Sequence, residues 1–177
     1  IRSGVGKVIA DLNFELPALA HGTRARIRSC YEYVRYLEEF LSNLPLLTQP
    51  YPEETRITAP IETWSDDFSM AIAGIPSMVN DFSAGEFMET HYHSQYDNEN
   101  FYQEPVYRFH HEMYAGLVLA FDRTAAVPMN FARLFEGAAA SIDGSVCRGA
   151  DADLPGLHLV LKQGIQAGEA LYSKIRE

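Results

Sequence analysis

Residues 88–102, METHYHSQYDNENFY, concentrate side chains that could bind a metal ion or move a proton. The stretch holds two histidines, one aspartate, two glutamates and three tyrosines. Because alternate residues of an extended chain project to the same side, His91 and His93 would point the same way in an extended loop. A His-x-His pair with nearby carboxylates is a zinc-binding pattern. An exposed polar loop gives the same composition, so spacing alone leaves both interpretations open.

Three carboxylates elsewhere occupy positions where chemistry is possible. Glu15 lies near the end of a predicted buried strand, where α/β folds bind their ligands. A carboxylate there is costly unless it is paired or bound to a metal, although a solvated glutamate at a strand end is the simpler interpretation. Asp66 and Asp67 stand at a predicted helix start, where N-capping and the helix dipole explain them without any function.

The remaining histidines and the known catalytic motifs add little. His110 and His111 fall on a predicted long helix, and one of two consecutive residues must face outward, so we expect surface or capping roles. The sequence contains no HExxH, no GxSxG and no glycine-rich phosphate loop. Nothing in the spacing orders serine, histidine and aspartate into a triad.

Composition excludes several classes of protein. The formal charge is −10, and the one basic cluster, RARIR at residues 24–28, is predicted to begin a solvated helix, so we expect no nucleic-acid partner. No apolar run approaches the roughly 20 residues of a membrane span, and the first residues do not resemble a signal peptide. Two cysteines, Cys30 and Cys147, make no disulfide framework, which fits a cytoplasmic protein.

Hydrophobic patterning predicts an α/β first half and a helical second half. Too few strands are predicted for a complete sheet. The predicted strands cover residues 7–16, 56–58 and 75–82, and a long polar loop covers 83–100. The predicted helices cover 24–43, 65–74, 104–123, a stretch after Pro128, and 157–175, with a Gly/Asp-rich connector before the last one.

Three stretches resemble, in order, motifs of the co-catalytic di-zinc exopeptidases, the family of zinc aminopeptidases, glutamate carboxypeptidase and the transferrin receptor. SDDFSMAIAGIPSM, residues 65–78, is similar to the family segment SDHxPFxxAGIPA. YHSQYDN, residues 92–98, resembles the motif that carries the last zinc-binding histidine. ADLNFEL, residues 10–16, resembles a strand whose terminal aspartate binds zinc. The resemblance covers residues 7–125 and implies the C-terminal part of a phosphorylase/hydrolase-like mixed-sheet peptidase fold.

The resemblance assigns roles to three residues. His93 matches the terminal zinc ligand, and Tyr92 matches a tyrosine that lines the substrate pocket in the glutamate carboxypeptidase branch. Asp97 or a backbone carbonyl could orient the imidazole of His93. Glu15 falls where the family has its ligand aspartate, and its additional methylene alters the reach to a metal. His91 has no ligand role in the motif.

The resemblance also shows what is missing from this chain. The family needs an upstream HxD motif, which bridges two zinc ions, and an upstream EE motif, which supplies the general base and a ligand. Both would precede residue 7, and the EE pairs at 38–39 and 53–54 occur in the wrong order. With at most two ligands, the chain cannot build the two-metal centre that activates water. We therefore expect the C-terminal portion of a longer exopeptidase, with no catalytic residue of its own and inactive as a fragment.

The expected organisation has two parts. Residues 1–126 would be the C-terminal part of the peptidase domain, and residues 127–177 a helical segment similar, at VPMNFARLFEG, to the start of a dimerisation segment in the transferrin-receptor-like branch. The expected partners are a peptide substrate, the missing N-terminal part and a second copy of the chain. Two hypotheses compete with the enzyme: a scaffold of the transferrin-receptor type without metal, and a free-standing α/β binding domain without exposed sheet edges.

Overall fold

The computed structural model describes residues 8–19, 23–44, 49–81, 86–149 and 153–177, and within these ranges four short strands form one mixed sheet. The strand order is β1-β4-β2-β3, with bounds Asp11–Asn13 for β1, Arg26–Ser29 for β2, Arg56–Thr58 for β3 and Ser77–Asp81 for β4. β1 is parallel to β4, β2 is antiparallel to β4, and β3 is parallel to β2. The fold class is therefore mixed α/β, as predicted.

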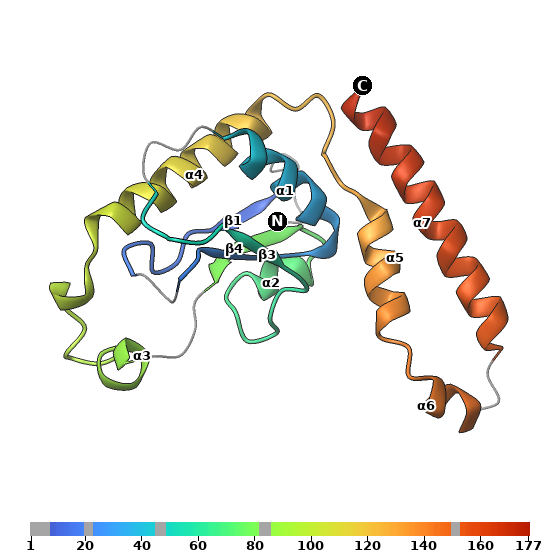
Figure 1. Ribbon diagram of the computed structural model, residues 1–177, viewed down its shortest axis with the longest axis horizontal. Helices are drawn as coiled ribbons and strands as arrows, with labels where there is room; N and C mark the ends of the chain where they lie inside the picture. The colour runs from blue at the N-terminus through green and yellow to red at the C-terminus, as the bar shows by residue number, and fades with distance from the viewer. Residues whose placement is uncertain (1–7, 20–22, 45–48, 82–85, 150–152) are drawn as a thin grey trace.

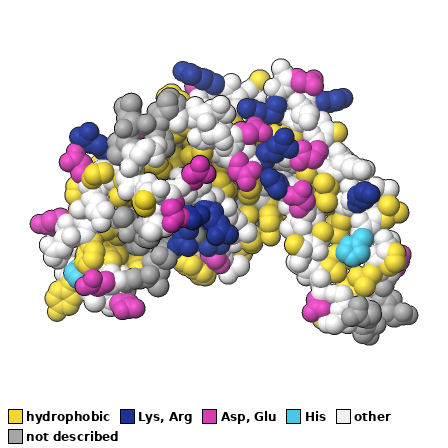
Figure 2. Space-filling model, in the orientation of Figure 1, with side chains coloured by type: hydrophobic (Ala, Val, Ile, Leu, Met, Phe, Trp, Pro, Cys, Tyr) yellow, Lys and Arg dark blue, Asp and Glu magenta, His cyan; other side chains and the backbone are white. Residues whose placement is uncertain are grey.

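Residues 26–28 of the basic segment belong to β2, so the prediction that this segment begins a helix is wrong. Ala25, Ile27 and Ser29 are buried while the arginines between them are partly exposed, which is the two-residue period of a strand. The register brings Arg26 beside Arg56 of β3. Figure 2 shows basic side chains gathered over the region of β2 and β3. The helical part of the predicted 24–43 element is confined to its second half.

The apolar face of the sheet is covered by two helices, α1 (Val34–Asn43) and α4 (Glu104–Asp122), which lie on one side of the strands (Figure 1). A 3₁₀ turn, η1 (Tyr31–Tyr33), leads into α1. The bounds of α4 agree with the prediction, including Pro105 in its first turn, where a missing N–H costs nothing. The buried core joins Ile27 and Met78 of the sheet to these elements through Tyr33, Tyr36, Leu37, Phe109, Met113, Leu117 and Phe121.

The segment between β3 and α4 contains more helix than the sequence predicts. α2 (Phe68–Ala71) falls inside the predicted helix 65–74. The predicted loop 83–100 holds α3 (Glu86–Thr90) and begins a 3₁₀ turn, η2 (Glu99–Phe101), so that prediction is wrong in part. Residues 82–85, which the sequence assigned to a strand end and a loop start, lie outside the described residues.

Three helices form an arm that projects from the sheet layer (Figure 1). They are α5 (Phe131–Ala140), α6 (Gly144–Gly149) and α7 (Leu154–Arg176). α6 lies within the predicted connector, which corrects that prediction. α7 begins before the predicted residue 157 because the Asp153 side chain caps it by accepting from Gly156 N–H at 3.0 Å. The outer surface of the arm exposes large apolar side chains, among them Val146, Leu157, Leu159, Val160 and Leu171.

A polar network joins the arm to α1. The fully buried Asn130 donates from Nδ2 to Glu169 Oε1 at 3.1 Å, and Arg35 pairs with the same carboxylate. Tyr172 donates to Glu39 Oε2 at 2.9 Å, and the Arg35 guanidinium lies 5.2 Å from the centroid of the Tyr172 ring. Because each carboxylate has more than one partner, the network fixes the position of α7 better than a single surface ion pair would.

None of the described helices combines the length and the apolar character that a membrane crossing requires.

Within the arm, a glycine of α7 lies close to the backbone of α5. A Cβ atom built on the buried Gly168 would lie 2.4 Å from the backbone N of Ala132, so the two helix backbones would have to separate. On Gly164 of the same helix, a Cβ would instead meet the side chain of Phe135, which can rotate away.

We predict that Gly168→Ala lowers the free energy of unfolding by about 1–3 kcal/mol, because overpacking outweighs the gain in helix propensity. The matched control, Gly164→Ala, should cost less. Urea denaturation followed by circular dichroism at 222 nm checks both variants. Equal stability of Gly168→Ala and the original chain would contradict the close α5–α7 packing.

Candidate functional site

A buried amide fixes the end of β1, where the candidate site lies. Asn80 of β4 accepts from the Glu15 N–H at 2.7 Å, and its Nδ2 donates to the Glu15 carbonyl oxygen. Tyr114 of α4 donates to the carbonyl oxygen of Asn13 at 2.9 Å and lies 3.3 Å from Asn80 Oδ1. Asn80 and Tyr114 are both buried. The backbone that carries the Glu15 carboxylate is therefore held by two elements other than its own strand.

The structure brings Glu15 and Tyr92 together. The hydroxyl of Tyr92, in the turn after α3, donates to Glu15 Oε1 at 3.4 Å. Partial burial, first of all, and the nearby Glu15 charge raise the pKa of Tyr92, so its phenol keeps the proton that it donates. Tyr92 is thus a neutral donor beside a carboxylate, at the carboxyl end of β1.

His93 adjoins this pair without joining it. Its ring is stacked on Tyr92 with centroids 3.9 Å apart and an interplanar angle of 19°. The residue is exposed and has φ of 54°, a left-handed conformation uncommon outside glycine. Asp97 donates its backbone N–H to Ser94, and no hydrogen bond between Asp97 and His93 exists among the described residues. The suggestion that Asp97 orients this imidazole thus has no support in the structure.

Further carboxylates surround Glu15. Burial, and then the charges of Asp66 and Asp67, raise the pKa of Glu15. Asp11 of β1 has a raised pKa for the same reasons, burial first and then Asp67. Asp67 is 2% exposed, and its Oδ1 accepts from the Ser65 hydroxyl. Its Oδ2 is buried without a hydrogen-bond partner among the described residues. An orphaned carboxylate oxygen among other carboxylates is an arrangement that a cation would stabilise.

The N-capping explanation of Asp66 and Asp67 is not borne out by the geometry of α2. Asp67 is the N-cap residue, and its side chain makes no capping hydrogen bond. Its buried carboxylate accepts instead from the Ser65 hydroxyl, and its backbone carbonyl oxygen accepts from the Ser77 hydroxyl at 3.3 Å. The sequence therefore identified these carboxylates but misjudged what Asp67 does.

Three other described histidines, His91, His110 and His111, have contacts outside the Glu15–Tyr92 pair. His91 is half-buried and packs its ring against Phe101 at 4.7 Å and Phe87 at 6.2 Å. His110 is buried, with Nε2 3.2 Å from the Tyr51 hydroxyl, so the expected surface role is wrong for this residue. His111 is exposed and fits that expectation. The two histidines of the HxH pair thus have different surroundings and do not converge on one point.

The side chains of the described residues do not complete a zinc site. In ranges 8–19, 23–44, 49–81, 86–149 and 153–177, no group of three or more His, Cys, Asp or Glu side chains is arranged to hold a metal ion. Glu15 lies at the carboxylate cluster, and His93 reaches it only through the stacked Tyr92. Any zinc ion bound here would need further ligands from outside this set.

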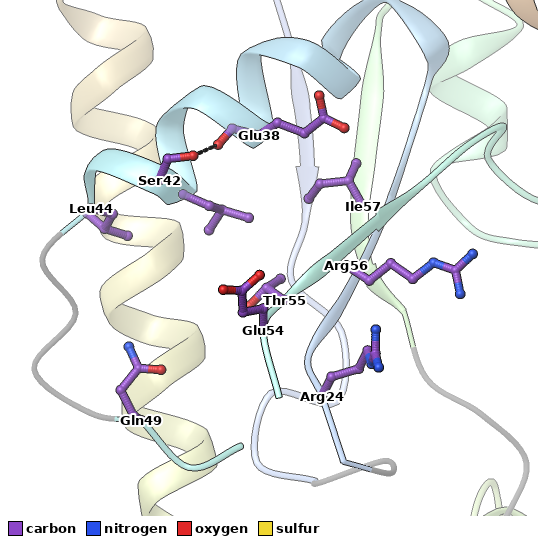
Figure 3. A pocket seen from close by; sticks show the side chains of 10 residues that line it. Arg24, Glu38, Ser42, Leu44, Gln49, Glu54, Thr55, Arg56 and Ile57 are labelled. Carbon is purple, nitrogen blue, oxygen red and sulfur yellow. Dashed lines mark hydrogen bonds between the residues drawn. The ribbon is translucent and has the colours of Figure 1, made fainter. Parts of the chain in front are cut away.

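A second cavity among the described residues lies away from this cluster. It is an open hollow of about 720 Å³ between α1 and β3 (Figure 3). Its lining includes arginines and glutamates together with the apolar side chains of Leu41, Leu44 and Ile57. Arg24 already pairs with Glu53, and Glu38 pairs with Arg133 at 3.3 Å. Because the lining carries charges of both signs and some of them are already paired, this cavity does not indicate a particular ligand or reaction.

Sequence patterns could not identify the residues that hold the site together. Asn80 and Tyr114 appear in the sequence as ordinary members of a strand and a helix, and their partners are distant along the chain. A polar residue within a predicted buried strand, VNDF at residues 79–82, was the one available signal for Asn80.

Comparisons with protein-family models, curated proteins and solved structures found no match to this chain.

The raised pKa of Glu15 gives a test of the cluster. Because the folded state disfavours the charged form, stability should fall as pH rises from the ordinary value of 4.5 through the folded pKa, and Glu15→Gln should remove this loss. Asp66→Asn should move the Glu15 titration toward 4.5, whereas Asp97→Asn, a change of an exposed aspartate outside the cluster, should not.

Carbon-13 NMR of the Glu15 carboxyl group over pH 3–8 measures this titration directly. An ordinary titration in the unaltered chain, or equal effects of the two aspartate variants, would contradict the proximity of Glu15 and Asp66.

Proposed function

We propose that this chain is the C-terminal portion of a zinc-dependent exopeptidase that hydrolyses terminal peptide bonds and is inactive without the rest of the protein. The motifs at residues 65–78 and 92–98 are the basis of the proposal. The observation that carries it is the contact between Glu15 and Tyr92, which are 77 residues apart in the sequence. Two residues that the resemblance assigns to one site are thus neighbours.

The proposal gives each residue a role. His93 and Glu15 would each supply one zinc ligand, and Tyr92 would contact the substrate. The remaining ligands and the general base would come from a part of the protein outside this sequence. When bound, two zinc ions would polarise the scissile carbonyl and lower the pKa of water. The side chains present here bind and orient: Asn80 holds the Glu15 backbone, and the neutral Tyr92 hydroxyl offers a proton to an acceptor.

The sheet supports the idea that another part of the protein completes the fold. Among the described residues β1 pairs only with β4, which leaves its outer edge without a neighbouring strand. Native proteins usually cover such an edge, so we propose that strands of the missing part extend a phosphorylase/hydrolase-like sheet from β1. An exposed edge is also the feature that counts against a free-standing domain.

The exposed apolar side chains of the arm suggest a surface for a protein partner. Its exposed leucines and valines would suit a second copy of the chain, consistent with a homodimer of the type that the resemblance implies. The segment 127–177 would then serve assembly, and residues 1–126 the reaction.

A binding scaffold without metal is the second candidate. It is favoured by Glu15 in place of the family aspartate and by the lack of a three-ligand group among the described residues. In this case the carboxylate cluster would be a relic that no longer binds zinc.

Zinc content and peptidase activity of the protein from the complete reading frame separate the two candidates. We predict zinc in the original protein and a loss of activity greater than about 100-fold in His93→Ala, because even residues that only support a ligand contribute up to about that much. His91→Ala, the matched control, should keep both zinc and activity. Zinc and activity that survive His93→Ala would refute the assignment, and a protein without zinc would favour the scaffold.

A further inference from the structure

An apolar pocket of about 260 Å³ adjoins the candidate site. One wall is the turn 16–19, and the other is the segment 97–99 with Tyr102. Phe87 also lines it. The volume is below the range of about 300–1,000 Å³ typical of pockets for whole small molecules, so it suits a single side chain.

The pocket is built by contacts between its two walls. Leu16 has φ of 42°, which turns the chain sharply after the clamped Glu15. The Leu19 N–H then donates to the Leu16 carbonyl oxygen at 3.3 Å. Across the pocket, Gln103 at the start of α4 donates its N–H to the carbonyl oxygen of Ala18 at 2.9 Å. The two walls are thus linked by a backbone hydrogen bond.

The pocket is contiguous with the Glu15–Tyr92 pair. Its first wall begins at the residue after Glu15, and the ring of Phe87 lies 6.1 Å from the ring of Tyr92. A peptide whose terminal bond lay at Tyr92 would therefore have a side chain within reach of the pocket.

The charges around the pocket favour a cation. Asp97 and Glu99 belong to its lining, and neither forms an ion pair with another described residue. The basic group that shares a small recess with Glu15 is Arg28, which already pairs with Glu62 at 2.9 Å. A free α-ammonium group complements the pocket side of the site, and a free α-carboxylate does not.

We propose that this pocket receives the apolar side chain of the amino-terminal residue of a peptide, with the free ammonium group near Asp97 and Glu99. That the bound peptide is then hydrolysed rests on the proposed exopeptidase function. Recognition of a free amino terminus favours an aminopeptidase over a carboxypeptidase. Binding itself needs neither zinc nor the rest of the protein.

The test measures binding of tripeptides to the 177-residue chain by NMR titration in the presence of a zinc chelator. Leu-Gly-Gly should bind at least about tenfold more tightly than Gly-Gly-Gly, because apolar groups of a ligand in such a pocket discriminate by this much or more. N-acetyl-Leu-Gly-Gly, which lacks the ammonium group, should bind several-fold more weakly than Leu-Gly-Gly. Tyr102→Ser, which removes one wall, should abolish the preference for leucine.

Tyr96→Ser is the matched control, since Tyr96 and Tyr102 are 60% and 49% exposed in the same segment and only Tyr102 lines the pocket. It should leave all affinities unchanged. Equal affinities for the leucine and glycine peptides, no binding of either, or equal effects of the two tyrosine variants would overturn the apolar pocket. Undiminished binding of the acetylated peptide would overturn the amino-terminal preference. A failure of the zinc assignment leaves these outcomes unaffected, so the two proposals fail separately.

Discussion

The candidate site depends on the side chain of Asn80. One planar amide satisfies both the N–H and the carbonyl oxygen of Glu15, and Tyr114 adds a hydroxyl from α4. Three elements, β1, β4 and α4, meet at this buried group. Loss of the amide would leave two partly buried backbone groups without partners, and full burial of such a group without a partner costs about 1–3 kcal/mol. This interaction sets the direction in which the chain leaves β1 at Glu15. It therefore also sets where the apolar pocket begins.

A conflict between charge and burial distinguishes this end of the sheet. Burial, and then the charges of Asp66 and Asp67, raise the pKa of Glu15, and one oxygen of the buried Asp67 has no partner among the described residues. Elsewhere the described acidic side chains at the root of the arm are matched to arginine or tyrosine. Local conflicts of this kind concentrate at functional sites, which is why we place the proposed site at this end of the sheet.

Sequence patterns predicted elements whose signals are local. α4 has a proline in its first turn and an apolar stripe, and its ends agree with the prediction. β2 was missed because Ile27, Cys30, Tyr31 and Val34 also have helical spacing, and only pairing with β3 and β4 decides between the two periods. α3 was missed because a helix of five residues has no stripe to detect. Glu15 was identified by its place at a predicted strand end and Tyr92 through the resemblance, but Asn80, the orphaned oxygen of Asp67 and the pocket arise from long-range contacts that no local pattern encodes.

We propose that the end of β1, with Glu15, Tyr92 and the adjoining His93, is one wall of a zinc site. The most direct measurement is a crystal structure of the protein from the complete reading frame, with anomalous diffraction data collected above and below the zinc absorption edge. We expect an anomalous peak within about 2.0–2.2 Å of a ring nitrogen of His93 and of a Glu15 oxygen, as zinc bonds require. A protein that binds zinc elsewhere, or a site at the end of β1 that stays without zinc when the metal is supplied, would contradict it.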